Sequence, residues 1–372
     1  MPESRPTTVA SGFECDENLA AALEWADHGL TEQLNGRIER AVALSGLTTF
    51  RLGGPARLLL RAQGVGDLEV LAEICARAAE KFDVEIPVVV IGQGSNLLIG
   101  DAGFEGVAIQ LSGDFSEVSI YSKPSTVHSA PENGADHNSA HNNSAKDTAI
   151  AVENIVTAGG AVKLPVLARK CAAAGYAGLG WMVGVPGSVG GAVRMNAGGH
   201  GSDISANLVS VTIVDISAEV GKRTRTVAKA ELGLGYRGSV VRRHEIVVSA
   251  SFACTSGSVT ELDSELTEIV RWRRANQPGG ANCGSIFTNP PGQSAGKLID
   301  DLGLRGFRLR PGATASVSEK HANFIQADPD GRSADVWALI VHVRNAVFSR
   351  YGIALHPEVQ TLGFDASLPE LS

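Results

Sequence analysis

An apolar, β-branched run that ends in a glycine loop is the feature that most constrains this chain. Residues 86–91 read Ile-Pro-Val-Val-Val-Ile and break abruptly at residues 92–96, Gly-Gln-Gly-Ser-Asn. A run of this composition predicts a buried strand. Glycine lets the backbone that follows approach a ligand closely, because it has no side chain in the way. The pattern therefore predicts a strand that delivers a loop able to cradle an anion.

A second glycine-dense stretch occupies residues 184–192, and residues 195–199 close it. Two such loops favour a dinucleotide, since a pyrophosphate needs backbone N–H groups presented at two points. Neither loop is a Rossmann fingerprint, because the spacings are G-x-x-G-x-x-G-G and G-x-G-S-N and no acidic residue stands at ribose distance. A Walker loop is absent too. Tight turns explain either loop taken alone, but the accompanying Ser95, Asn96 and Asn196 favour a ligand site.

The alternation of elements indicates an α+β fold. Strand-like segments stand at 56–60, 208–216, 225–227 and 246–252, helix-like ones at 68–81, 164–174, 262–270 and 336–348. Residues 255–258 are a plausible domain junction. The division expected is an N-terminal accessory segment at 1–46, a domain at 47–256, a smaller domain at 257–365 and a tail at 366–372.

Residues 112–148 are rich in Ser, Asn, Ala and His and poor in large apolar residues, which predicts a flexible surface insertion. Its His128, His137 and His141 could mimic metal ligands, but no cysteine or paired carboxylate accompanies them, so no metal site is expected.

Charge and cysteine usage exclude several classes of protein. The net charge of the 372 residues is −8 with dispersed Lys and Arg, which argues against a nucleic-acid or anionic-membrane partner. The five cysteines are odd in number and form no C-x-x-C pair, which disfavours zinc and disulfides and fits a reducing cytoplasm. No signal peptide or bilayer-spanning run is apparent, so we expect a cytoplasmic protein without membrane insertion.

Four side chains are weighed as candidates for chemistry. Ser285 lies in the octet Cys-Gly-Ser-Ile-Phe-Thr-Asn-Pro at 283–290 and is a candidate proton donor or nucleophile, although a polar turn is the alternative. Arg237 could hold a carboxylate in bidentate fashion or be a solvated surface residue. Taken alone, Glu358 and His321 are more simply explained as a strand-end charge and a packed histidine.

Eight motifs taken in order resemble the UDP-N-acetylenolpyruvoylglucosamine reductase family, and the match covers residues 48–363. Within that family the chain resembles the class that lacks a tyrosine-bearing lid loop, since residues 294–300 follow almost directly on the serine motif. The motifs stand at 49–55, 92–98, 184–199, 235–237, 284–290, 295–300, 317–325 and 357–363.

The resemblance implies an FAD-binding domain of the vanillyl-alcohol-oxidase (PCMH) type followed by a smaller α+β substrate-binding domain. It implies non-covalent FAD that NADPH reduces and that then reduces an enolpyruvyl ether of a UDP-sugar. The implied catalytic residues are Ser285 as proton donor, Arg237 and Glu358. The implied cofactor residues are Arg51, Gly53, Gly92, Gly94, Ser95, Asn96, Gly184, Gly187, Ser188, Gly191 and Asn196. The implied substrate residues are Tyr236, Asn289, Lys297, His321 and Asn323.

Two other functions compete with this interpretation. A flavin oxidase of the same fold would share the glycine loops but would not need the serine motif, and a non-catalytic binding module would need none of the three catalytic residues. Three departures from the family pattern are the insertion at 112–148, His200 in place of an aromatic residue, and Arg310-Pro311 in place of glycine. They predict altered loop geometry and nucleotide contacts.

Overall fold

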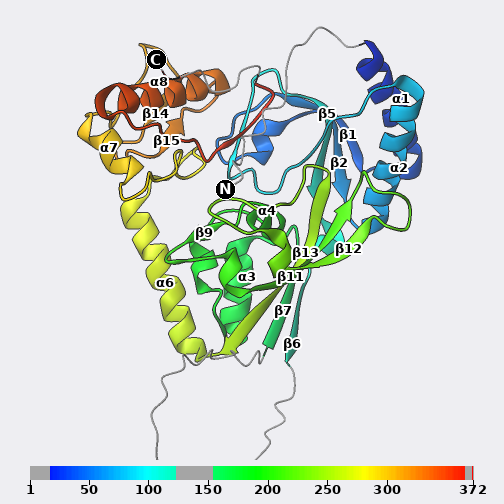
Figure 1. Ribbon diagram of the computed structural model, residues 1–372, viewed down its shortest axis with the longest axis horizontal. Helices are drawn as coiled ribbons and strands as arrows, with labels where there is room; N and C mark the ends of the chain where they lie inside the picture. Colours follow the sequence, from blue (N-terminus) through cyan, green and yellow to red (C-terminus); the bar gives the residue numbers. More distant parts are fainter. Residues whose placement is uncertain (1–16, 123–153, 365–370, 372) are drawn as a thin grey trace, which may run out of the picture.

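The computed structural model describes residues 17–122, 154–364 and 371. They form two sheets with flanking helices and a C-terminal part that follows a long helix (Figure 1). None of the described helices is both long and apolar enough to cross a membrane.

The first sheet has the strand order β1-β2-β5-β3. Strand β1 (Ile38–Ala43) is antiparallel to β2 (Pro55–Ala62), whereas β5 (Phe104–Leu111) runs parallel to both β2 and β3 (Val88–Val90). Helices α1 (Glu17–Gln33) and α2 (Val65–Phe82) cover one face of this sheet at the edge of the molecule (Figure 1). Leu58 and Leu60 pack toward these helices and Leu59 toward the opposite face, which explains the continuous apolar run of β2.

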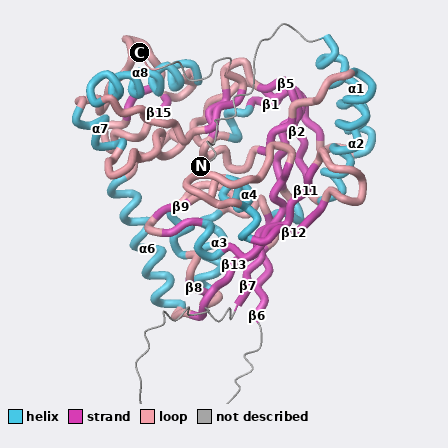
Figure 2. The backbone as a smooth tube through the Cα atoms, viewed as in Figure 1, coloured by secondary structure: helices cyan, strands magenta, loops and turns pink. Residues whose placement is uncertain are grey.

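The second sheet is antiparallel, in the order β12-β11-β13-β7-β6. It consists of β6 (Val118–Ser122), β7 (Asn154–Gly159), β11 (Leu208–Asp215), β12 (Thr224–Ala228) and β13 (Glu245–Ser256), with β8 (Tyr176–Ala177) paired to the end of β13. Val214 and Ile246 of this sheet belong to the same core cluster as Leu58. Figure 2 shows the strands of both sheets running together through the right half of the view.

Short elements lie between β7 and β11 of the second sheet. They are α3 (Leu164–Ala173), α4 (Val189–Arg194), α5 (Ile204–Asn207) and the hairpin of β9 (Gly198–Gly199) with β10 (Ser202–Asp203). Single 3₁₀ turns lie at Leu44–Leu47, Gly113–Ser116, Gly180–Gly184 and Lys229–Leu232.

Helix α6 (Val259–Asn276) leads from the second sheet to the C-terminal part along one edge of the molecule (Figure 1). That part holds α7 (Ala295–Asp301), the β14 (Ala315–Val317) and β15 (Ile325–Ala327) hairpin, and α8 (Ser333–Tyr351), which Gly352 ends at φ 68°. Finally β16 (Gln360–Leu362) pairs in parallel with β4 (Leu97–Ile99). The chain end is thereby fixed beside the loop at 92–96.

Two expectations about organisation need correction. Residues 112–122, expected to begin the flexible insertion, are ordered as a 3₁₀ turn and β6, because Phe115 is buried and β6 pairs along β7. The rest of that insertion, from residue 123, lies outside the described residues, as do its three histidines. The segment expected to be accessory is part of the first layer of the fold. Its strand β1 pairs with β2 in the first sheet, and Leu23 and Leu30 of α1 enter the core beneath that sheet.

Candidate active site

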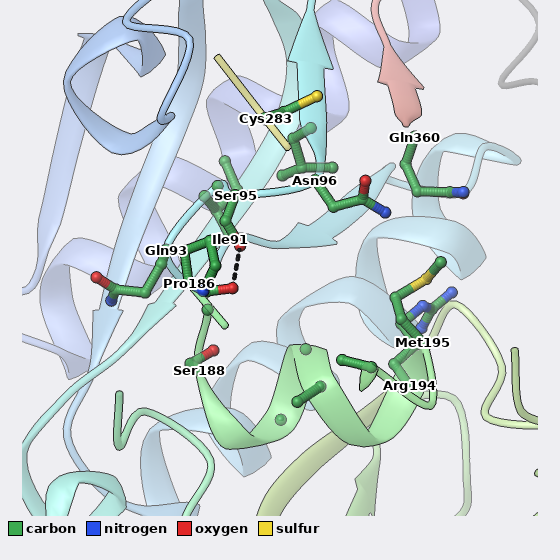
Figure 3. A pocket seen from close by; sticks show the side chains of 18 of the residues that line it. Ile91, Gln93, Ser95, Asn96, Pro186, Ser188, Arg194, Met195, Cys283 and Gln360 are labelled. Carbon is green, nitrogen blue, oxygen red and sulfur yellow. Dashed lines mark hydrogen bonds between the residues drawn. The ribbon is translucent and has the colours of Figure 1, made fainter. Parts of the chain in front are cut away.

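A cavity of about 790 Å³ opens where the two sheets meet the C-terminal part. The loop at 92–96 forms one wall and the loop at 184–191 another, as Figure 3 shows for Ser95, Pro186 and Ser188. The C-terminal part contributes Cys283, Ser285 and Glu358 to the lining. Residues distant in the sequence therefore share one chamber, which is the usual form of a cofactor or substrate site.

The two glycine loops touch each other across the cavity. Ser95 Oγ donates a hydrogen bond of 3.0 Å to the carbonyl of Pro186, drawn as the dashed line in Figure 3. A Cβ at Gly92 would lie 2.3 Å from Ser188 Oγ, so a side chain at Gly92 would require the Ser188 hydroxyl to move. The loops thus form one continuous backbone surface.

The amides of residues 92–96 are the strongest sign of an anion site. Among the described residues, none of them donates a hydrogen bond to another backbone carbonyl. Buried or half-buried amides without a protein partner require one from a ligand or water. Successive amides of this kind suit a pyrophosphate, so the loop fits the diphosphate of a dinucleotide.

Some of the expected cofactor residues lie outside the cavity lining or are also needed for packing, and their contact with the cofactor stays a prediction. Gly53 lies outside the cavity lining, where a Cβ would meet Ile99 at 2.9 Å, and the exposed Arg51 also lies outside it. Gly94 lines the cavity but is also required for packing, because its φ is 55° and a Cβ would lie 2.1 Å from the carbonyl of Leu47. Gly184, Gly187, Ser188 and Gly191 all line the cavity.

Arg237 reaches the cavity from a tight turn between Gly235 and Gly238, which exchange backbone hydrogen bonds of 3.0 and 3.4 Å. Its φ of 57° lies in the left-handed region, which a non-glycine residue seldom adopts. Asn196, expected to bind the cofactor, donates to the carbonyl of Gly235 at 2.9 Å and accepts from the amide of Ser205 at 3.0 Å, and its contact with the cofactor stays a prediction. Asn196 therefore holds the turn that presents Arg237.

Arg237 and Glu358 form an ion pair, with 3.0 Å between Nε and Oε2. The Glu358 side chain is only 11% exposed. Burial raises the pKa of this carboxyl above its ordinary value, and Arg237 and Tyr236 oppose that rise in part. A carboxyl in these surroundings holds a proton more readily than a surface glutamate.

Backbone contacts connect the segment that carries Ser285 to the segment that carries Glu358. The amide of Glu358 donates to the carbonyl of Ile286 at 2.7 Å, and Phe287 bridges to Pro357. Asn96 completes the arrangement, since its Nδ2 donates to the carbonyl of Glu358 at 3.1 Å and its own carbonyl accepts from Gln360 at 3.0 Å. The glycine loop and all three candidate catalytic residues are thus brought together.

The expected substrate residues are more scattered. Tyr236 is 70% exposed, and its ring lies 5.5 Å from the Arg237 guanidinium, beside a smaller hollow of about 400 Å³. Asn289 accepts from the amide of Ala295, and Lys297 pairs with Asp301. Both lie outside the cavity lining, as do His321 and Asn323. Their contact with substrate stays a prediction.

Sequence reasoning missed several lining residues. Arg194, Arg242, Arg243 and Arg273 surround the cavity with positive charge, and the adjacent pair at 242–243 was the available signal. Cys283 and Gln360 flank the catalytic positions, two residues from Ser285 and Glu358. Burial chiefly raises the pKa of the Cys283 thiol, with a contribution from Glu358, so it is held protonated. Among the described residues, no three His, Cys, Asp or Glu side chains gather as a metal site.

Comparison with known proteins defines the class first. Residues 141–222 match the model of an FAD binding domain, and residues 276–362 match the model described as UDP-N-acetylenolpyruvoylglucosamine reductase, C-terminal domain. The chain is an FAD-dependent oxidoreductase. These matches agree with the expected order of an FAD-binding domain followed by a second domain, and the structure confirms the expected α+β class.

Full-length relatives then identify the family. The UDP-N-acetylenolpyruvoylglucosamine reductase of Agathobacter rectalis is 36% identical over 85% of this chain and 91% of that protein. The one from Gloeobacter violaceus is also 36% identical, over 89% and 98%. The solved reductase of Thermus caldophilus superposes with a TM-score of 0.65 at 30% identity, covering 88% of this chain and 99% of the other. The chain belongs to the UDP-N-acetylenolpyruvoylglucosamine reductase family.

Proposed function

We propose that this chain reduces UDP-N-acetylenolpyruvoylglucosamine to UDP-N-acetylmuramate in the cytoplasm, with NADPH as the source of electrons and non-covalent FAD as their carrier. The observation that carries the proposal is the Arg237–Glu358 ion pair on the wall of a glycine-lined cavity, one backbone contact from Ser285. The described cysteines are all free, which agrees with a reducing compartment.

The cavity suits anionic ligands. The amides of the loop at 92–96 would hold the FAD diphosphate, supported by the adjoining loop at 184–191. The five lining arginines, Arg237 among them, supply local positive charge that a chain of net charge −8 cannot supply as a whole. When bound, FAD accepts a hydride from NADPH and delivers it to the methylene carbon of the enolpyruvyl group.

Arg237 opposes the negative charge that the reaction creates. Addition of hydride to the methylene carbon leaves an electron pair on the neighbouring carbon, shared with the substrate carboxylate as an enediolate. A guanidinium stabilises that charge more in the transition state than in the substrate, which is the requirement for catalysis. Glu358 pairs with the guanidinium and, when protonated, donates a second hydrogen bond to the same oxygens.

Ser285 completes the reaction by donating its hydroxyl proton to the carbon that carries the electron pair. A C–H bond forms, the O–H bond of Ser285 breaks, and the serine regains a proton from solvent. A serine is a weak acid, but the enediolate carbon is more basic still. The product is a lactyl ether, two electrons and two hydrogens richer than the substrate.

The test is a spectrum of the purified protein under nitrogen. The flavin absorption should bleach when NADPH is added and return when the enolpyruvyl nucleotide is added, with a lactyl ether as the product. Recovery of the colour with oxygen and an alcohol-derived product, but not with the nucleotide, would instead identify a flavin oxidase. A colourless protein that binds the nucleotide without turnover would identify a binding module.

A further inference from the structure

The segment that carries Ser285 is held by a single buried side chain on one side. Asn323 Oδ1 accepts from the amide of Phe287 at 3.0 Å, and Asn323 Nδ2 donates to the carbonyl of Phe287 at 2.9 Å. The amide of Ile286 also donates to the Asn323 carbonyl at 2.8 Å. Asn323 is 5% exposed, and Ile286 and Phe287 are almost fully buried. One amide side chain therefore satisfies both polar backbone groups of a residue, as a neighbouring strand would.

The opposite side of the same segment carries Glu358. The carbonyl of Ile286 accepts from the amide of Glu358 at 2.7 Å, and the amide of Thr288 donates to the carbonyl of His356 at 2.9 Å. Residues 285–288 are thus clamped between Asn323 and residues 356–358. Movement of this middle segment would shift Ser285 and Glu358 together.

Asn323 is itself fixed in the turn between β14 and β15. The backbone amide of Asn323 donates to Nδ1 of His321 at 3.2 Å, and the backbone amide of Phe324 donates to the His321 carbonyl at 3.0 Å. Phe324 lines the cavity but Asn323 does not. The arrangement leaves Asn323 with both side-chain polar atoms committed to Phe287, which differs from the substrate contact expected from the sequence.

We propose that Asn323 is a positioning residue for proton transfer, which sets the placement of Ser285 against Glu358 without touching substrate; the proposal rests on the function proposed above. Removing its side-chain amide leaves the N–H and C=O of Phe287 buried without partners, which is unfavourable. The segment then shifts or loosens. A misplacement of about 1 Å in a reacting group can slow a reaction roughly 100-fold.

The experiment measures the two half-reactions separately by stopped-flow absorbance under nitrogen. Asn323→Ala should be reduced by NADPH within about twofold of the parent rate. Its saturated rate of reoxidation by the enolpyruvyl nucleotide should fall roughly 10–100-fold, with little change in the concentration needed for half-saturation. Because proton transfer then limits the step more strongly, the solvent deuterium isotope effect on reoxidation should rise.

Asn207→Ala is the matched control. It also removes an amide that donates to a backbone carbonyl, that of Ala253 at 3.0 Å, and Asn207 lies outside the cavity lining. Both half-reactions of this variant should match the parent. If Asn323→Ala does not fold, Asn323→Ser keeps one polar atom at the position and is measured in the same way.

Three results would overturn the proposal. A parent-like reoxidation rate shows that Asn323 is not needed for placement. A higher nucleotide concentration at half-saturation, with an unchanged saturated rate, shows that Asn323 binds substrate. Equal slowing of both half-reactions shows that its role is only structural. A parent protein that the nucleotide does not reoxidise refutes the proposed function itself, and with it this proposal.

Discussion

At the scale of single residues, Arg237 is held in an unfavourable backbone conformation. A left-handed non-glycine residue costs roughly 1–2 kcal/mol, and here the bonds of Asn196 and the ion pair with Glu358 oppose that cost. The head group is thereby brought to the cavity wall, whereas glycine at this position would relieve the strain and supply no charge. A strained backbone that brings the Arg237 charge to the cavity wall agrees with the role proposed for this residue.

Ser285→Ala should separate the two half-reactions. Reduction by NADPH should stay near the parent rate, because the hydroxyl acts only after hydride transfer. Reoxidation by the enolpyruvyl nucleotide should slow by roughly 10²–10⁴, as expected for a lost general acid. Stopped-flow traces decide the outcome, with Ser264→Ala on the exposed face of α6 as the control. Parent-like reoxidation would show that Ser285 is not the proton donor.

Glu358→Gln should change how stability depends on pH. Because the folded pKa of Glu358 is raised, the native state binds more protons than the unfolded state between the ordinary carboxyl pKa and the folded one. The parent's free energy of unfolding therefore falls as pH rises through that window, and this contribution is absent in the variant. Relative to Glu358→Gln, the parent should lose stability from pH 4.5 toward neutrality.

Urea unfolding at a series of pH values measures this difference. Glu268→Gln on the exposed surface of α6 is the control and should follow the parent at every pH. If the parent instead gains stability relative to Glu358→Gln as pH rises, the attraction of Arg237 outweighs burial and Glu358 is ionised during the reaction.

At the scale of elements, the segment between β6 and β7 can be tested by replacement. Ser122 and Asn154 are partners in the antiparallel register, so the chain leaves β6 and enters β7 at neighbouring points. Replacing 124–152 by a short Gly-Ser linker should leave flavin content and turnover within a few fold. Loss of flavin would show that the segment takes part in binding.

Replacing 112–148 instead is the informative comparison. That change also removes β6 and the buried Phe115, leaving the edge of β7 unpaired. Loss of a buried phenylalanine alone costs about 3–5 kcal/mol, so this variant should unfold at a distinctly lower temperature. Equal melting temperatures for the two replacements would contradict the assignment of residues 112–122 to the sheet.

Element types followed from local pattern more readily than their partners did. The period of α8 and the stop at Gly352 predicted that helix, and the β-branched run predicted β3 and the loop after it. The strand was expected to be buried, but β3 is a half-buried edge strand. The role of residues 112–122 was not predictable, because β6 is short and half-exposed and is ordered by β7. The Asn323 clamp was equally hidden, since its partner at Phe287 is brought near only by tertiary folding.

At the scale of the whole molecule, the site depends on the return of the chain to β4, beside the loop at 92–96. Strand β4 follows the loop at 92–96 and pairs with β16, which follows Glu358. Phe50 and Leu98 belong to the same core cluster as residues of α7 and α8. The loop at 92–96 and Glu358 are therefore positioned by one shared strand pair and one shared core, although they lie far apart in the sequence.

This shared cavity also bears on how FAD is held, and all flavin should leave the chain on denaturation. Covalent attachment would need a nucleophile at the cavity wall, where Cys283 and His200 are candidates. Burial raises the pKa of the Cys283 thiol, and the thiolate is the reactive form, so Cys283 is a poor nucleophile here. Burial and Arg273 lower the pKa of His200, so its ring is neutral and chemically able to attack.

Acid precipitation should nonetheless leave a colourless pellet and intact FAD in the supernatant by chromatography. Flavin retained in the pellet, and lost in His200→Ala or Cys283→Ala, would establish attachment and contradict the prediction, and FMN alone in the supernatant would contradict FAD as the cofactor.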